Sequence, residues 1–122
     1  MNWSAIAAVF LALAVGLGAF GAHGLKARLD PYHLDIYKTA VLYHFLHALG
    51  ILIVSVLPKT GTFTIDSANS VCWLLATGIL IFSGSLYMLA ITGVGALGAV
   101  TPFGGVAFIL GWLLLAWKLV RK

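Results

Sequence analysis

The sequence predicts an all-α integral membrane protein with four transmembrane helices in a compact bundle. Of its 122 residues, 62% are hydrophobic and only 8% are charged, whereas soluble domains carry about a quarter charged residues. The charged residues are confined to three places, residues 26–38, 59–66 and 118–122. The apolar stretches between them show no strand-like alternation. Since a helix satisfies its backbone groups within one segment, these stretches are expected to be helical.

The lengths of the uncharged stretches set the number of crossings. One crossing needs roughly 20 apolar residues, so residues 1–25 and 39–58 each suit one helix. Residues 67–117 are too many for one crossing and must fold back at an apolar, glycine-rich turn at 93–102. A single transmembrane domain, 1–122, is therefore expected, with helices at about 4–24, 31 or 38–57, 68–92 and 102–119.

Capping residues mark the expected helix ends. Asp30 followed by Pro31 is a typical N-cap and first helical position, so the second helix is expected to begin before the membrane. The first helix is expected to be retained, because a signal peptide needs a positively charged start that this stretch lacks. The other end signals are Pro58 with Gly61 after the second helix, Asp66 or Ser67 before the third, and Thr101 with Pro102 before the fourth.

Small residues recur at every fourth position on the first and last helices. This spacing places them on one face, where two backbones can approach closely. We expect these rows to pack against helices of the same chain, against a second copy in a homo-oligomer, or against another membrane protein. The rows are Ala8, Ala12 and Gly16; Ala14, Gly18 and Ala22; and Ala107 with Gly111.

Polar side chains of the first three helices are expected to meet in one half of the bilayer. A polar side chain in lipid is costly, so each one is a candidate functional group. The alternating direction of the helices places the candidates near the loop that carries Lys26. They are His23, Tyr43, His44, His47, Ser83, Ser85 and Tyr87. His44 and His47 lie three residues apart and share one face of their helix.

Four interpretations of this polar cluster stay open. Its imidazoles and hydroxyls can fix helix register by hydrogen bonding, line a pocket for a lipid headgroup, quinone or small ligand, form a proton or ion pathway, or bind a metal or haem. A zinc site usually takes four Cys, His or carboxylate ligands, and the spans hold no acidic residue. The same lack disfavours an ion pathway, although histidine titrates near neutral pH.

No motif for catalysis stands in its required context. Residues 16–21 match the G-x-G-x-x-G pattern of dinucleotide sites, but they lie inside an apolar span and not after a strand. No acidic residue within the spans can complete a catalytic triad with Ser83 or Ser85. We therefore expect a protein that is not an enzyme and that has no catalytic residue, cofactor, metal or nucleic-acid partner.

The basic residues favour one orientation by a small margin. Four spans place both termini on one face with the loop at 59–66. That face carries Lys59, Lys118, Arg121 and Lys122, and the opposite face carries Lys26, Arg28 and Lys38. Because cytoplasmic loops are enriched in Lys and Arg, we expect cytoplasmic termini in a multi-pass protein of the cell membrane, the inner membrane if the source is bacterial.

Four segments carry a resemblance to a known family. They are GAFGAHGL at 18–25, YHFLHAL at 43–49, FSGSLY at 82–87 and LGAVTPFGGVAF at 97–108. In order and spacing they resemble the small membrane proteins grouped as domain of unknown function 423, also called the transmembrane protein 256 family. The resemblance covers nearly the whole chain. It implies a small multi-helix protein of an inner or organelle membrane, and it brings no activity or catalytic residue.

Two functions follow as hypotheses. The first is a structural or interaction protein of the lipid bilayer that packs through its Gly and Ala rows. The alternative is a binding or transport module for a small ligand, lipid, ion or proton, built on the polar cluster. A closed bundle would favour the first hypothesis, and a polar cavity reaching the histidines would favour the second.

Overall fold

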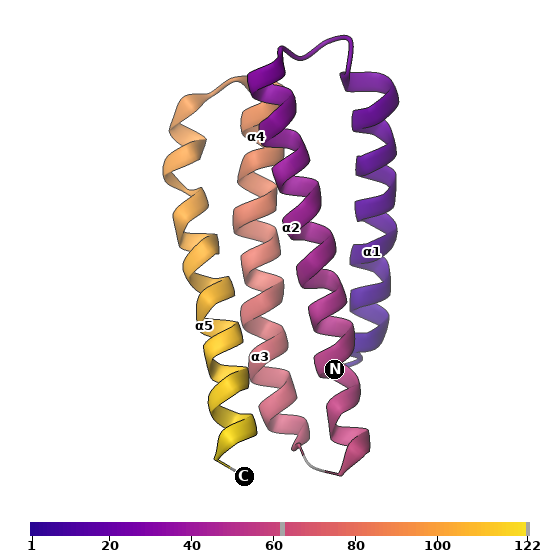
Figure 1. The fold of residues 1–122 in the computed structure, drawn as a ribbon, viewed down its shortest axis with the longest axis vertical. Helices are drawn as coiled ribbons and strands as arrows, with labels where there is room; N and C mark the ends of the chain where they lie inside the picture. Colours follow the sequence, from indigo (N-terminus) through magenta and orange to yellow (C-terminus); the bar gives the residue numbers. More distant parts are fainter. Residues whose placement is uncertain (62, 122) are drawn as a thin grey trace.

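The computed structural model describes residues 1–61 and 63–121, and every regular element in these ranges is helical. The chain forms four long helical rods (Figure 1). Each rod is long and apolar enough to cross a membrane: Trp3–Leu25, Pro31–Thr60, Ile65–Thr92 and Gly95–Val120. The predicted all-α architecture with four transmembrane helices is therefore confirmed.

In the described residues, all four rods contain a change of helix type. The first two consist of α1 (Trp3–Phe20) with the π-helical turn η1 (Gly21–Leu25), and α2 (Pro31–Val56) with the 3₁₀ turn η2 (Leu57–Thr60). The third consists of α3 (Ile65–Gly78), the π-helical turn η3 (Ile79–Ser83) and α4 (Gly84–Thr92). The fourth consists of the 3₁₀ turn η4 (Gly95–Ala99), which lies in the predicted glycine-rich turn, and α5 (Thr101–Val120).

The cap at the start of α2 is formed as the sequence predicts. The Asp30 carboxylate accepts a hydrogen bond from the backbone N–H of His33 at 2.8 Å, and Pro31 is the first helical residue. This hydrogen bond and a second one from the His33 imidazole lower the pKa of Asp30, because both favour the charged carboxylate. The second helix ends at Gly61, whose φ of 81° is a left-handed conformation that suits glycine.

Two predicted caps are wrong by a few residues. The third helix begins at Ile65, and its cap is Thr64, whose hydroxyl accepts from the backbone N–H of Ser67. The last helix has no side-chain cap, because Thr101 is already helical and its hydroxyl meets Ser85. The hydroxyl of Thr64 thus caps the third helix in place of Asp66 or Ser67, and the hydroxyl of Thr101 contacts a neighbouring helix instead of capping its own.

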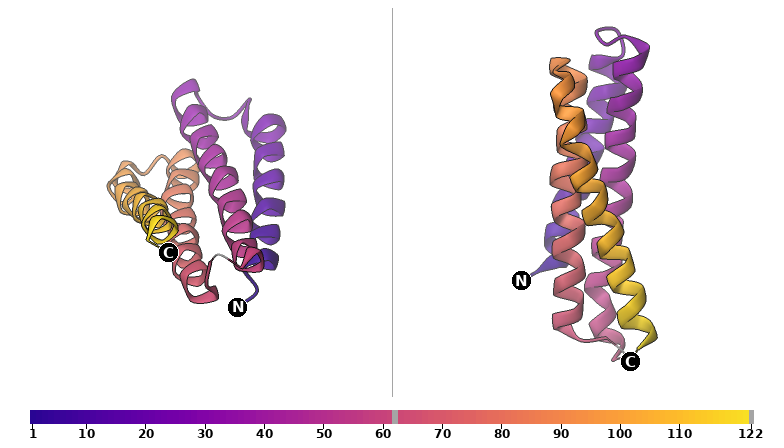
Figure 2. Two further views of the ribbon diagram at one scale, coloured as in Figure 1. Left: turned by 60° about the horizontal axis from the view of Figure 1, so that its bottom comes forward. Right: turned by 90° about the vertical axis from the view of Figure 1, so that its left-hand side faces the viewer.

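The helix α2 lies at the centre of the bundle. It contacts α1, α3, η3 and α4, while α5 packs mainly on α3 and η3. In Figures 1 and 2, α1 and α5 lie on opposite flanks, and both ends of the chain lie at the same end of the bundle. Lys122, one of the basic residues assigned to that end, lies outside the described residues.

Glycines on one helix provide space for aromatic rings of a neighbouring helix. A Cβ atom added to Gly50 would lie 2.7 Å from the ring of Trp112 on α5. The same clash would arise at three other glycines: Gly21 with Tyr37, Gly78 with Phe108, and Gly104 with the backbone of Phe82. Close approach therefore joins glycine to aromatic rings in this bundle, in addition to the contacts between small residues that the sequence predicts.

One predicted packing row does not pack within the chain. Ala8, Ala12 and Gly16 are all exposed, and a Cβ at Gly16 would meet nothing within 4 Å. This row does not make the expected contact with helices of its own chain, because α1 has helices on one side only, and its buried residues Trp3, Ala7 and Ala14 fill that side. The expected contact with a second copy or another membrane protein stays a prediction.

The other two rows lie at or near helix contacts. Ala14 is fully buried, and a Cβ atom added to Gly18 would lie 3.5 Å from the side chain of Val41 on α2. Ala22 is exposed but lines a small cavity between the first two rods. Ala107 and Gly111 of α5 are buried, and Gly111 faces Leu75 of α3.

We expect Gly104→Ala to lower stability, because its methyl group would meet the Phe82 backbone, which cannot rotate away as a side-chain end does. Such overpacking costs about 1–3 kcal/mol. The matched control is Gly105→Ala, whose methyl group would make ordinary contact with the Phe82 ring at 3.8 Å. That variant should be neutral or stabilised, since Ala favours a helix over Gly by about 1 kcal/mol. Equal melting temperatures of the two variants in detergent would contradict this packing.

Candidate functional site

His44 connects three helical rods at mid-bundle. Its side chain is only 4% exposed, and its Nδ1 lies 2.8 Å from the hydroxyl of Tyr87 on α4. On its other side the ring makes an edge-on contact with Phe10 of α1, with ring centroids 6.1 Å apart. The expected contact of a histidine with another helix is thus made by His44.

The second ring nitrogen of His44 lacks a partner. Among the described residues, Nε2 of His44 is a buried side-chain atom without a hydrogen bond. A neutral imidazole carries one donor and one acceptor. Which of the two groups donates in the contact between Tyr87 and Nδ1 therefore depends on the tautomer of His44.

Two hydroxyls bind backbone carbonyls of neighbouring helices. Ser83, at the end of the π-helical turn η3, is fully buried and donates to the carbonyl of Ala40 on α2 at 2.8 Å. Tyr37 of α2 donates to the carbonyl of Leu17 on α1, and its ring occupies the space that Gly21 leaves. These bonds hold α2 against both of its neighbours.

Ser85 belongs to a separate contact. Its Oγ lies 2.6 Å from the hydroxyl of Thr101 at the start of α5, and it donates to the Phe82 carbonyl at 3.0 Å. The contact joins α4 to α5 directly across the glycine-rich turn. It therefore fixes the point at which the fourth rod enters the bundle.

Tyr43 and His47 face α5 and not His44. The ring of His47 stacks on Phe108 with centroids 3.5 Å apart, and its Nδ1 bonds to the Tyr43 carbonyl one turn earlier in α2. The Tyr43 ring packs against Phe82 at 4.5 Å. Within the described residues, no hydrogen bond is formed by the Tyr43 hydroxyl. This pair therefore acts through its rings.

His23 does not join the other candidates. It is exposed on η1, whose buried residues are Gly21 and Leu25. Residues 21 and 25 are four positions apart and share the inner face, so residue 23, between them, points outward. The prediction that His23 lies in the cluster was wrong because it was based on depth along the helix and not on the face of the helix.

The candidate residues thus form several helix-to-helix contacts and not one ligand pocket. A cavity of about 750 Å³ lies at the opposite end of the bundle, and its lining includes none of the seven candidates. In residues 1–61 and 63–121, no three His, Cys, Asp or Glu side chains come together as metal ligands. Cys72, buried on α3, contacts the Ile51 carbonyl at 3.8 Å.

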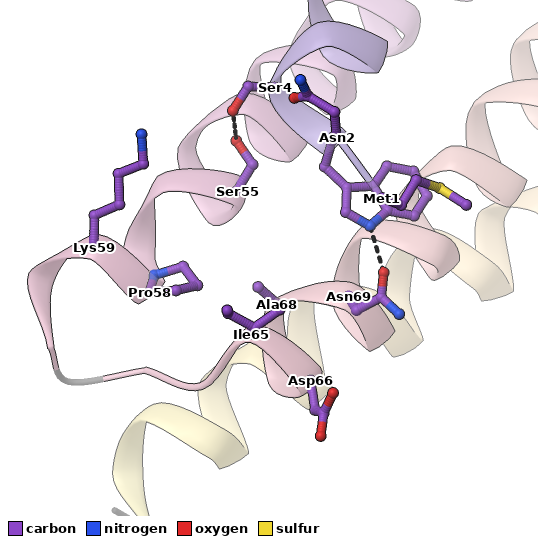
Figure 3. A pocket seen from close by; sticks show the side chains of 11 residues that line it. Met1, Asn2, Ser4, Ser55, Pro58, Lys59, Ile65, Asp66, Ala68 and Asn69 are labelled. Carbon is purple, nitrogen blue, oxygen red and sulfur yellow. Dashed lines mark hydrogen bonds between the residues drawn. The ribbon is translucent and has the colours of Figure 1, made fainter.

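Sequence reasoning missed a second set of polar contacts near the chain ends. The Trp3 indole donates to Asn69 at 2.6 Å, and the hydroxyls of Ser4 and Ser55 lie 2.8 Å apart (Figure 3). The helix directions that located the first cluster also place Ser4, Ser55 and Asn69 at one common end. The missed signal was this second convergence. Tyr37, which lies on the same face of α2 as His44 and earlier in the chain, was also left out of the candidate set.

Comparison with known proteins identifies close relatives. The profile of the family described as "Protein of unknown function (DUF423)" matches residues 17–105. The chain is 45% identical over 116 residues to "UPF0382 membrane protein YwdK" of Bacillus subtilis (strain 168), covering 95% of this chain and 94% of that protein. It is 48% identical over 103 residues to a "UPF0382 membrane protein" of Staphylococcus epidermidis (strain ATCC 12228), covering 84% and 82%. No solved structure matches the chain.

We expect Tyr87→Phe to destabilise the bundle, because it removes the hydroxyl that bonds His44 and keeps the ring. A buried polar atom left without its partner costs about 1–3 kcal/mol. The matched control is Tyr43→Phe, which deletes a hydroxyl without a hydrogen bond among the described residues and should change the free energy of unfolding little. Reversible unfolding in mixed detergent measures both variants. If Tyr43→Phe costs as much as Tyr87→Phe, the His44 contact is not a stabilising bond.

Proposed function

We propose that this chain, which belongs to the family described as "Protein of unknown function (DUF423)", is a structural or interaction protein of the membrane and not an enzyme. It is an integral membrane protein: four helices can span the bilayer, and its relatives are named membrane proteins. The proposal concerns what the bundle does there.

One observation carries this proposal. Three buried polar side chains of the spans bond from one helical rod to another: His44 to Tyr87, Ser83 to Ala40 and Ser85 to Thr101. Groups used in this way hold the helices in register and are not free to bind a substrate. The absence of an acidic residue in the predicted spans, together with this use of the hydroxyls, supports a scaffold over a catalyst or a carrier.

The exposed face of α1 supports association with a second copy. The row Ala8, Ala12 and Gly16 is a small-residue face of the kind that lets two transmembrane helices approach closely. It lies on the outside of the rod that has the fewest contacts, with 17% of its span buried against 39% for α2. We propose that this row contacts the same row of another copy.

A specific observation favours the alternative function, a small-ligand or proton-binding module. The buried Nε2 of His44 has no hydrogen-bond partner among the described residues, and such an atom is paired with a ligand or water in most proteins. A substitution of His44 distinguishes the scaffold function from the binding function. A scaffold keeps its function when His44 is replaced by a residue that preserves stability, whereas a binding module loses it.

The proposed orientation places both chain ends in the cytoplasm. Lys59, Lys118 and Arg121 lie at the end of the bundle that carries the termini, and Lys26, Arg28 and Lys38 lie at the other end. With Lys122 the margin is one basic residue, which favours this direction under the positive-inside rule.

Association through α1 predicts that Gly16→Leu disrupts the oligomer and leaves the monomer intact. A Cβ at Gly16 meets nothing within 4 Å in its own chain, so the larger side chain costs the fold little. The dissociation constant measured by energy transfer in bilayers should rise about tenfold or more, equivalent to 1.4 kcal/mol. Ala116→Leu, an exposed small-to-large change on α5, is the control. Equal effects of both variants, or a monomeric parent, would refute the interface.

The proposed topology predicts opposite labelling of the two ends. In a Cys72→Ala background, a cysteine replacing Arg28 should react with a membrane-impermeant maleimide added to intact cells. A cysteine replacing Lys59 should react only after the cells are opened, because that end faces the cytoplasm. Labelling of both positions from outside would exclude four spans, and the reverse pattern would invert the orientation.

A further inference from the structure

The cavity at the end of the bundle that carries the termini is built by three separate segments. The start of α1, the end of α2 with η2, and the start of α3 surround a volume of about 750 Å³ (Figure 3). Small-molecule sites in proteins enclose about 300–1,000 Å³. The cavity is therefore large enough for a headgroup-sized ligand, and the proposed scaffold function does not require it.

Its inner wall is polar and held in place by hydrogen bonds. The single hydroxyl proton of Ser55 goes to the Leu52 carbonyl at 2.6 Å, so Ser4 is the donor in the contact with Ser55. The Asn69 carbonyl oxygen accepts from Trp3, which leaves the Asn69 amide nitrogen without a bond among the described residues. The amide N–H groups of Asn69 are therefore available to a ligand, and they lie beside side chains whose positions are fixed by hydrogen bonds.

The rim carries one cation and one anion. Lys59 and Asp66 both line the cavity, and Figure 3 shows them on different sides of it. In addition, α1 begins at the cavity, and the N–H groups at a helix start favour a negatively charged group. The start of α3 already carries the negative charge of Asp66 in its first turn. This arrangement complements a ligand that has a phosphate at one end and an ammonium group at the other.

The cavity lies at the depth of the lipid headgroups. Three spanning segments end or begin around it, at Trp3, Thr60 and Ile65. Trp3 in its wall packs edge-on against Trp73, with ring centroids 5.1 Å apart, and Trp73 is half exposed. Tryptophan is enriched at this level of membrane proteins because its ring is apolar and its N–H is polar.

An apolar groove on α1 begins where the cavity lining on α1 ends. The groove of about 280 Å³ is lined by Ala5, Ile6, Val9, Phe10 and Leu13, whereas the cavity includes Met1 to Ser4. A soluble phosphate compound has no apolar chain that could fill such a groove, whereas a lipid has an acyl chain that could. The groove therefore favours a membrane lipid over a soluble phosphate compound as the ligand.

We infer that this cavity binds the headgroup of a zwitterionic aminophospholipid, with the phosphate near Lys59 and the start of α1, the ammonium near Asp66, and an acyl chain along the groove of α1. The lipid class follows from the pair of opposite charges on the rim. The apolar groove makes the ligand a bilayer lipid and not a free phosphoester.

The test measures lipid retention by the purified full chain with native mass spectrometry. The probes are phosphatidylethanolamine, phosphatidylglycerol and diacylglycerol with identical acyl chains. We expect phosphatidylethanolamine to be retained best and diacylglycerol least. Lys59→Gln should weaken both phospholipids about fivefold, the effect of one lysine near a charged headgroup. Asp66→Asn should abolish the preference for phosphatidylethanolamine over phosphatidylglycerol. Lys26→Gln, at the other end of the bundle, should change neither.

Three results would overturn the inference. Equal retention of diacylglycerol and phosphatidylethanolamine would show that the headgroup is not recognised. Equal effects of Lys59→Gln and Lys26→Gln would place the headgroup elsewhere. Displacement of the lipid by soluble glycerophosphoethanolamine at millimolar concentration would make the cavity a site for a soluble phosphoester. None of these results bears on the Tyr87 and Gly16 variants, so the scaffold proposal stands or falls separately.

Discussion

The bundle depends on one constraint: in a lipid bilayer, water does not drive apolar helices together. Helices must then be held by close packing and by hydrogen bonds between them. This chain meets the constraint through its central helix α2. Tyr37 fills the space above Gly21 of the first rod, Gly50 receives Trp112 of the last, and His44 bonds Tyr87 of the third. Each neighbour of α2 is thereby fixed by a contact of definite geometry.

The same constraint explains why polar side chains stand beside irregular helical turns. The π-helical turns η1 and η3 lie next to the two hydroxyls that bind carbonyls across the bundle, those of Tyr37 and Ser83. In hydrocarbon an unpaired hydroxyl is costly. The Leu17 carbonyl, which accepts from Tyr37, lies just before η1, whereas Ser83 lies in η3 and donates to a carbonyl of the regular helix α2. The buried hydroxyls therefore stabilise the packing instead of opposing it.

Charge position and segment length were sufficient to predict the four rods, and helix direction predicted that the second and third rods meet through His44, Ser83 and Tyr87. Contacts at the level of single side chains were not predictable in the same way. The direction of His23 depends on which face of the first rod meets α2, and position along the helix does not reveal this face. The row Ala8, Ala12 and Gly16 has the right spacing for packing, but its exposure depends on how few helices surround α1. The fold decides which glycine meets which aromatic ring, so the sequence of one helix alone does not predict these contacts.

The helix α1 packs mainly on α2, and it takes part in both the large cavity and the proposed contact with a second copy. Near its start, side chains hold it through Trp3 with Asn69 and Ser4 with Ser55, and both pairs also form the wall of the large cavity. A ligand that binds the cavity only when α1 is docked stabilises the docked state by mass action. The position of α1 in turn sets which residues its outer face presents to a second copy. The proposed lipid site and the proposed contact with a second copy thus both require the same placement of α1 against α2 and α3, although each is tested by its own variants.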